Sequence, residues 1–207
     1  MARPGPQGKA VAGQGWTESC LYLRVVGVRG KRPLGWPPMQ GRLGPWEKVN
    51  DMTMNLSDIL ARNGVVSALK AQDKKQVLQS IAERASKVTE VATHDIYTAL
   101  LQRERLSSTG LGSGIAIPHV KLAGLTSIVC LFARLSTPVA FESHDEQPVD
   151  LVFFLLAPEH AGGDHLKALA RISRLVRDPA TLEALRSAKD EAALTRVLTS
   201  PITSHAA

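Results

Sequence analysis

The spacing of apolar residues predicts alternating helices and strands between residues 56 and 199. Residues 56–60 have the pattern of a short helix, and residues 65–69 have that of a strand. Asp73 is a suitable N-cap for a helix that runs to about Val91. One face of this helix would carry apolar residues at three- and four-residue spacing, namely Val77, Leu78, Ile81, Ala82 and Ala85.

A second helix is predicted to begin at Thr93 or His94 and to end before a glycine-rich loop. Its buried stripe would consist of Ile96, Ala99, Leu100 and Leu106.

The remaining elements are three strands followed by three helices. Strands are predicted at about 115–118, 126–135 and 149–157, and helices near 164–177, 179–187 and 190–199. The strand at 149–157 is a continuous apolar run, which is typical of an inner strand covered on both faces. Strands with covering helices predict an α/β fold, a mixed β-sheet flanked by helices.

Residues 1–51 differ in composition from the rest of the chain. They contain eight Lys or Arg residues but three Asp or Glu, together with all three Trp, six of the 12 Pro and nine of the 16 Gly. This content of Pro and Gly disfavours a packed fold, although residues 21–26 have the pattern of an isolated strand. We interpret the segment as an extension that is disordered or not native, with Met52 or Met54 as the natural start. A basic docking arm is the alternative, and residues 52–207 form the predicted domain.

Composition excludes several functional classes. No apolar run approaches the roughly 18 residues that span a bilayer, and Cys20 and Cys130 have no metal-binding or redox spacing. We therefore expect a soluble protein of the reducing cytoplasm, without stable membrane insertion. The formal net charge of +6 does not indicate nucleic-acid binding, because residues 52–207 carry 17 basic and 16 acidic residues. The chain also lacks the phosphate-binding loop of a nucleotide-dependent kinase.

The most informative segment for function is residues 107–121, in which a glycine-rich loop and a short apolar run precede His119. The loop contains Gly110, Gly112 and Gly114. These glycines would allow positive φ angles and a close approach of backbone N–H groups to an anion. Pro118 fixes the direction in which His119 leaves the strand. An imidazole in this position is a nucleophile and phosphate acceptor near neutral pH; a structural histidine is the alternative.

Residues 103–119, RERLSSTGLGSGIAIPH, resemble the active-site segment of the enzyme IIA domains of the bacterial phosphotransferase system, fructose/mannitol class. Residues 54–60, MNLSDIL, resemble the start of the nitrogen-related branch of that class, and no sugar-specific IIB or membrane IIC portion is present. The resemblance covers roughly residues 54–200. It implies the type 2 IIA fold, again a mixed sheet with flanking helices.

The resemblance implies that His119 accepts a phosphoryl group and that His165 and Arg103 lie beside it. On residue pattern alone, Asp164 would cap a helix and place His165 in its first turn, where free N–H groups favour a phosphate. A surface histidine is the alternative. The guanidinium of Arg103 would bind phosphate oxygens or an acidic group on the donor, with a solvated helix end as the alternative.

Three further residues are candidates for a phosphate-binding loop, namely Thr109, Gly112 and Gly114. For the hydroxyl of Thr109, loop capping is an equally good explanation. Where related domains often have glycine after the histidine, this chain has Val120, which we expect to narrow access to His119.

We expect neither a cofactor nor a metal. A zinc site built from His119, His160 and His165 would lack both a compact ligand spacing and a clear fourth ligand.

The implied reaction is transfer of a phosphoryl group from the phosphohistidine of an HPr-like phosphocarrier protein (NPr) to His119, without a bound nucleotide. Two functions are compatible with it. In the first, the phosphorylation state regulates partners such as potassium-transport or sensor proteins; in the second, a sugar-specific relay passes the phosphate to a IIB component. The absence of a fused IIB or IIC portion favours the first.

Overall fold

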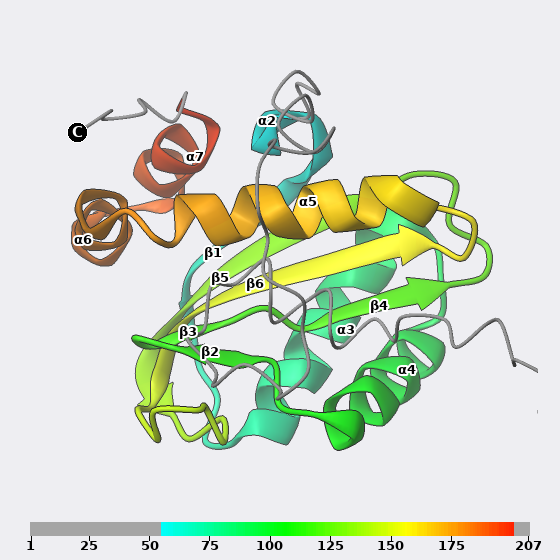
Figure 1. The fold of residues 1–207 in the computed structure, drawn as a ribbon, viewed down its shortest axis with the longest axis horizontal. Coiled ribbons are helices and arrows are strands. Elements are labelled where there is room, and N and C mark those ends of the chain that lie inside the picture. The colour runs from blue at the N-terminus through cyan, green and yellow to red at the C-terminus, as the bar shows by residue number, and fades with distance from the viewer. Residues whose placement is uncertain (1–54, 201–207) are drawn as a thin grey trace, which may run out of the picture. The chain divides into compact units, whose positions relative to one another are not determined.

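The structure, a computed structural model, describes residues 55–200, which fold into one mixed β-sheet with helices on both faces (Figure 1). The strands are β1 (Leu60–Leu69), β2 (Gly110–Gly112), β3 (Ile115–Ala116), β4 (His119–Leu122), β5 (Val129–Val139) and β6 (Val149–Pro158). The helices are α2 (Leu56–Ile59), α3 (Lys74–Thr89), α4 (Thr93–Leu106), α5 (Gly162–Leu175), α6 (Pro179–Ser187) and α7 (Glu191–Thr199). The extension at residues 1–51, with its expected strand at 21–26, lies outside the described residues.

Strand β6 lies inside the sheet and determines where the other strands pair. The strand order is β1-β5-β6-β3-β2, and β4 pairs with β6 beyond the end of β3. Strand β5 is antiparallel to β6, whereas β3 and β4 are parallel to it. The residues from Leu151 to Ala157 are all 0% exposed. The inner strand and the α/β class predicted from the sequence are therefore confirmed.

Alternate residues of β6 face two different layers of helices. Phe154 and Leu156 belong to a buried cluster with α3 and α4. Phe153 and Leu155 belong to a second cluster with α2, α5, α6 and α7. Since side chains alternate along a strand, the sheet separates two apolar layers. Figure 1 shows α5 running alongside β6 on the second face.

Helix boundaries follow the capping residues in most cases. Helix α3 begins where predicted because the carboxylate of Asp73 accepts the N–H of Gln76 at 2.8 Å. It ends at Thr89, before the predicted limit, because Glu90 adopts a left-handed conformation with φ +61°. Its predicted apolar face is buried.

Two expectations about helices were wrong. Asp164 does not cap α5, which begins at Gly162 with Ala161 as its N-cap; Asp164 lies in the first turn and pairs with Lys167 at 2.6 Å. Leu106 is not part of the buried stripe of α4, because it is the last residue of the helix and is 83% exposed.

The strand expected at 115–118 is divided in two by Pro118. Proline has no N–H to contribute to a strand ladder, so β3 ends at Ala116 and β4 begins at His119. The carbonyl of Pro118 still accepts the N–H of Leu155 at 3.0 Å. His119 is thus the first residue of a strand, not the residue that follows one.

Two other strands have limits that differ from the predicted ones. Strand β1 begins at Leu60 instead of residue 65 and has an irregular register against β5 between Leu60 and Val65. The strand expected at 126–135 runs from Val129 to Val139.

Candidate functional site

The imidazole of His119 is held at both of its nitrogens. Its Nδ1 lies 2.8 Å from the carbonyl oxygen of Ile117, and its Nε2 lies 3.2 Å from Nε of Arg103. A carbonyl can only accept and an arginine N–H can only donate, so both contacts require the proton on Nδ1 and the lone pair on Nε2. Nε2 of His119 therefore carries the lone pair of the neutral ring. His119 as a whole is 7% exposed.

Arg103 reaches His119 from the last turn of α4. Besides Nε2 of His119, its guanidinium contacts the carbonyl of Ser107 through Nη1 at 3.0 Å. These contacts make Arg103 a partner of the histidine and not the solvated helix end that was its alternative. The next basic residue, Arg105, is exposed.

His165 completes a pair of buried imidazoles. It lies on α5, is 5% exposed, and its ring centroid is 5.6 Å from that of His119, with 46° between the ring planes. The topology explains the encounter: β4 pairs with β6 from Leu155 onward, and the chain returns from β6 directly into α5. The surface position that was its alternative is therefore wrong.

Thr109 is buried, and both of its donors are already used. The carboxylate of Glu104 accepts its N–H at 2.9 Å and its hydroxyl at 2.7 Å. Glu104 in turn lies 2.8 Å from the ammonium of Lys74, and its side chain is 7% exposed. Sequence reasoning missed Glu104, because nothing in the pattern distinguishes a buried carboxylate here from a solvated one.

Gly112 and Gly114 do not lie beside His119. Gly114 directly precedes Ile115, and Gly112 pairs with it across β2 and β3. Ile115 pairs with Leu151, whereas His119 pairs with Leu155. Four residues along a strand correspond to about 13 Å. The expected phosphate-binding role is therefore not supported by the position of these two glycines.

The glycine loop instead closes over two carboxylates. A Cβ on Gly112, whose φ is +96°, would lie 2.9 Å from a carboxylate oxygen of Asp145, and one on Gly114 would lie 2.5 Å from Asp150. The N–H of Ser113 donates to Asp145 at 2.7 Å, and this hydrogen bond is the main cause that lowers the pKa of Asp145 below its usual value. The charge of Asp145 disfavours a phosphate in this position, whereas Asp150 is already paired with Arg186.

Val120 does not narrow access to His119. It belongs to the apolar cluster on the α3 and α4 face, whereas Leu155, the partner of His119, belongs to the opposite cluster. Successive strand residues point to opposite faces, so Val120 points away from the imidazole.

The other described histidines contribute no site. His94, His144 and His160 are exposed, and among residues 55–200 no group of three His, Cys, Asp or Glu side chains is placed to hold a metal ion. Within the same residues, no helix combines the length and apolar character needed to cross a bilayer.

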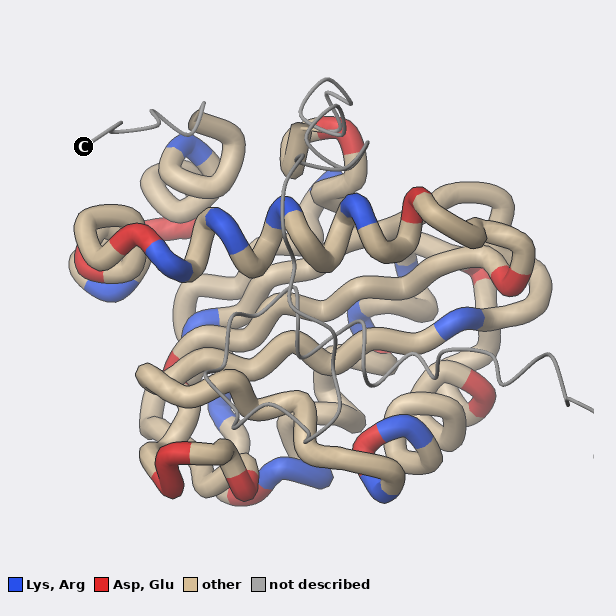
Figure 2. The backbone as a smooth tube through the Cα atoms, in the orientation of Figure 1, with Lys and Arg blue, Asp and Glu red and all other residues tan. Residues whose placement is uncertain are grey.

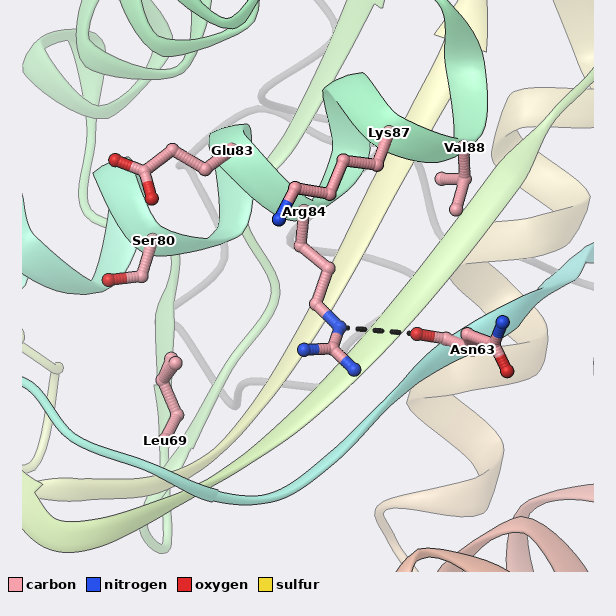
Figure 3. A pocket seen from close by; sticks show the side chains of 7 residues that line it. All are labelled: Asn63, Leu69, Ser80, Glu83, Arg84, Lys87 and Val88. Atoms are coloured by element: carbon pink, nitrogen blue, oxygen red, sulfur yellow. Dashed lines mark hydrogen bonds between the residues drawn. The ribbon is translucent and has the colours of Figure 1, made fainter.

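A groove of about 510 Å³ lies elsewhere, between α3 and β1 (Figure 3). Arg84 points into it and donates to the carbonyl of Asn63 at 3.1 Å. Its lining contains no histidine or cysteine and none of the predicted site residues. The groove therefore lacks the imidazole that the implied reaction requires.

Charge is distributed over the described elements without one dominant sign (Figure 2). Basic positions recur along α5 at Lys167, Arg171 and Arg174, in the helix that carries His165. Two large apolar side chains are also exposed close in sequence to the site: Leu106, 83% exposed, and Leu166, 40% exposed.

Comparison with known proteins identifies the family to which the chain is related. Residues 58–200 match the family described as "Phosphoenolpyruvate-dependent sugar phosphotransferase system, EIIA 2". A nitrogen regulatory protein of Bradyrhizobium diazoefficiens is 51% identical over 148 residues, which cover 72% of this chain and 97% of that protein. A nitrogen regulatory protein of Escherichia coli is 39% identical, with coverage of 72% and 93%.

Solved structures agree with the sequence matches. The crystal structure of the nitrogen regulatory protein IIA-Ntr from Neisseria meningitidis aligns with a TM-score of 0.67 and 31% identity, covering 70% of this chain and 99% of that one. The chain belongs to the EIIA 2 family of the phosphoenolpyruvate-dependent sugar phosphotransferase system.

Proposed function

We propose that the chain is a phosphohistidine carrier of the nitrogen-related phosphotransferase system. It accepts a phosphoryl group on His119 from an HPr-like phosphocarrier protein (NPr) and regulates partner proteins through its phosphorylation state. The observation that carries the proposal is the arrangement of His119: Nδ1 donates to Ile117, and the lone pair of Nε2 faces Arg103. The nitrogen regulatory names of similar proteins support the regulatory branch.

The transfer needs no base. The Nε2 lone pair of His119 forms a bond to phosphorus while the N–P bond of the donor phosphohistidine breaks and returns its electron pair to the donor ring. The proton on Nδ1 stays in its hydrogen bond to Ile117 throughout. Because the transition state of phosphoryl transfer is loose and charge-rich, alignment and positive donors supply most of the acceleration.

Arg103 and His165 are the groups placed to meet the charge of the phosphoryl oxygens. The guanidinium of Arg103 already lies at Nε2 of His119, where the phosphorus would bind. His165 approaches from α5, and its ring centroid lies 5.6 Å from that of His119. The Nε–H of Arg103 leaves the lone pair of Nε2 as phosphorus approaches, and a phosphoryl oxygen then accepts it.

A protein donor suits the surroundings of the site better than a small molecule. Leu106 follows Arg103 by one helical turn, Leu166 follows His165 directly, and both are exposed. A docked protein would remove these two side chains from water, which a small-molecule donor would not. The basic row along α5 would attract a carrier that bears a phosphoryl group.

Phosphorylation of His119 would change the site mainly through charge. A phosphoryl group adds about two negative charges at neutral pH. Partners such as potassium-transport or sensor proteins would then bind one form in preference to the other. This is the regulatory half of the proposal.

A sugar-specific relay is the second candidate. It is favoured by the family description, which names sugar transfer. In that case the phosphoryl group would leave Nε2 of His119 for a fructose- or mannitol-specific IIB component.

The deciding measurement is the intact mass of the full chain after incubation with enzyme I, an HPr-like carrier and phosphoenolpyruvate. We expect one acid-labile phosphoryl adduct on the wild type and on His165→Ala, the latter formed slowly, and none on His119→Ala. A folded wild type without an adduct, in the presence of competent donors, would contradict the proposal. Subsequent addition of a IIB component separates the two candidates, because only a relay loses its adduct to it.

A further inference from the structure

Two consecutive residues of α4 reach the two nitrogens of His119 by different routes. Arg103 donates directly to Nε2. Glu104 accepts both donors of Thr109, whose carbonyl accepts the N–H of Ile117 at 3.0 Å. The carbonyl of Ile117 then accepts from Nδ1 of His119. A continuous chain of contacts thus joins the Glu104 carboxylate to the ring atom opposite the nucleophile.

The Ile117–Pro118 peptide, which carries the Ile117 carbonyl, has no N–H of its own and is held through the peptides on either side of it. On one side the carbonyl of Thr109 accepts the N–H of Ile117, and on the other the carbonyl of Pro118 accepts the N–H of Leu155 in β6. Thr109 is 1% exposed and Ile117 is 0% exposed, so water does not replace these partners. The direction of the Ile117 carbonyl therefore depends on where Glu104 holds Thr109.

The Glu104 carboxylate is fully engaged. Its Oε1 accepts the N–H of Thr109 and pairs with Lys74, and its Oε2 accepts the Thr109 hydroxyl. Lys74 also pairs with the exposed Glu142 at 3.1 Å and lies 5.2 Å from the ring centroid of Phe141. A buried carboxylate with three donors has one low-energy position. The anchor of the chain of contacts is accordingly rigid.

We propose that Glu104 is a positioning residue for phosphoryl acceptance, which fixes the tautomer and orientation of His119 through Thr109 and Ile117. With the Ile117 carbonyl in place, the proton of the neutral ring stays on Nδ1 and Nε2 keeps its lone pair. If that carbonyl turns away, only the contact from Arg103 still opposes a proton on Nε2, and the Nε2-protonated tautomer becomes more populated. That tautomer cannot attack phosphorus. The importance of the effect for the reaction rests on the proposed function, whereas the effect on the tautomer does not.

The test compares Glu104→Gln with Glu142→Gln in the full chain. Both variants remove one carboxylate partner of Lys74, but only Glu104 contacts Thr109. Long-range ¹H–¹⁵N spectra report the protonated nitrogen of His119, and initial rates of phosphorylation by an HPr-like carrier report the reaction. We expect Glu104→Gln to populate the Nε2-protonated tautomer and to slow phosphorylation on the order of tenfold. Glu142→Gln should match the wild type in both measurements.

A second pair of variants covers the case in which Glu104→Gln does not fold. Thr109→Val keeps the backbone contacts and loses the hydroxyl, whereas Thr109→Ser keeps both donors. The proposal expects a shift toward the Nε2-protonated tautomer in Thr109→Val, smaller than in Glu104→Gln because the N–H of residue 109 still reaches Glu104, and the wild-type tautomer in Thr109→Ser.

Folded Glu104→Gln with an unchanged His119 tautomer would overturn the proposal, even if its phosphorylation were slow, because Glu104 would then be merely structural. An unchanged tautomer in Thr109→Val would overturn it where Glu104→Gln is unfolded. A wild type that is not phosphorylated at all would instead remove the proposed function, and the tautomer comparison would still decide the role of Glu104.

Discussion

Arg186 of α6 binds Asp150, near the start of β6, through two parallel contacts. Its Nε lies 2.7 Å from one carboxylate oxygen and its Nη2 lies 2.9 Å from the other. The same Nη2 donates to the carbonyl of Ser113 at 2.7 Å. The hydrogen bond with Asp150 is the main cause that raises the pKa of Arg186 above its usual value. One guanidinium thus joins a C-terminal helix, the central strand and the glycine loop.

Replacing Arg186 by Lys should lower the free energy of unfolding by about 1 kcal/mol, because an ammonium cannot reproduce the two parallel contacts. Both side chains are partly exposed, at 35% and 23%, and solvent screening keeps the loss small. Urea denaturation followed by circular dichroism measures it. Arg196→Lys on the exposed side of α7 is the control and should be neutral. Equal losses in the two variants would show that the Arg186 contact contributes nothing.

Replacing Arg103 by Lys should slow phosphorylation of His119 on the order of ten- to a hundredfold while leaving the fold intact. Lys keeps the charge but loses the planar donors that contact Nε2 of His119 and the carbonyl of Ser107. Quenched-reaction mass spectrometry gives the rate, and Arg105→Lys, two residues away and exposed, is the matched control. Equal rates in both variants would remove Arg103 from the site.

Replacing Gly112 by Ala should destabilise the protein by about 1–3 kcal/mol without slowing phosphorylation of the folded molecules. The residue has a φ of +96°, and the new Cβ would meet Asp145 at 2.9 Å. Gly124→Ala is the control for backbone strain alone, because Gly124 has a φ of +83° with nothing within 4 Å. Thermal denaturation and phosphorylation rates are compared. A folded Gly112→Ala that no longer accepts phosphate would restore this loop as a phosphate-binding element.

The thiol of Cys130 should remain unreactive in the native protein. Its titration should lower the free energy of unfolding at high pH. Burial raises the pKa of its thiol from the ordinary 9.0 to about 12. The unfolded chain therefore loses this proton before the native one does, so stability is unaffected below about pH 9 and falls as the pH rises from there toward 12. The slope reaches about 1.4 kcal/mol per pH unit.

The measurement for Cys130 is the free energy of unfolding between pH 8 and 11 for the wild type and Cys130→Ala. The difference between their slopes isolates this thiol from other titrating groups. Peptide-level alkylation should label Cys130 only after unfolding. Parallel stability curves, or rapid labelling of the native protein, would contradict the prediction.

Much of the fold could be predicted because burial leaves a direct record in the residue pattern. The uninterrupted apolar run of β6 indicates a strand that is covered on both faces, and β6 is buried on both faces in the structure. Asp73 marks the start of α3 because an N-cap is a local interaction. The predicted burial of Leu106 was wrong because apolar residues at helical spacing can continue into the last turn of a helix even where that turn no longer packs on the core.

The residue pattern predicted the parts of the candidate site, whereas only the family resemblance predicted that His165 and Arg103 lie beside His119. The approach of His165 to His119 depends on the parallel pairing of β4 with β6, which no local pattern encodes. The burial of Glu104 depends on Lys74 from another helix. Gly112 and Gly114 were predicted to bind phosphate because glycines with positive φ occur both in tight turns and in anion-binding loops. The sequence alone does not distinguish these two uses.

His119 belongs to a strand whose register against the central strand is set residue by residue, from Leu155 to Pro158. An acceptor built into such a scaffold has little freedom to reshape the backbone when it gains a phosphoryl group. On the proposed function, a partner would have to distinguish two molecules of nearly the same shape. Discrimination would then depend on charge and would fade as salt shortens the Debye length below about 10 Å. Ionic strength would therefore determine how large the difference is between the partner's affinities for the two forms.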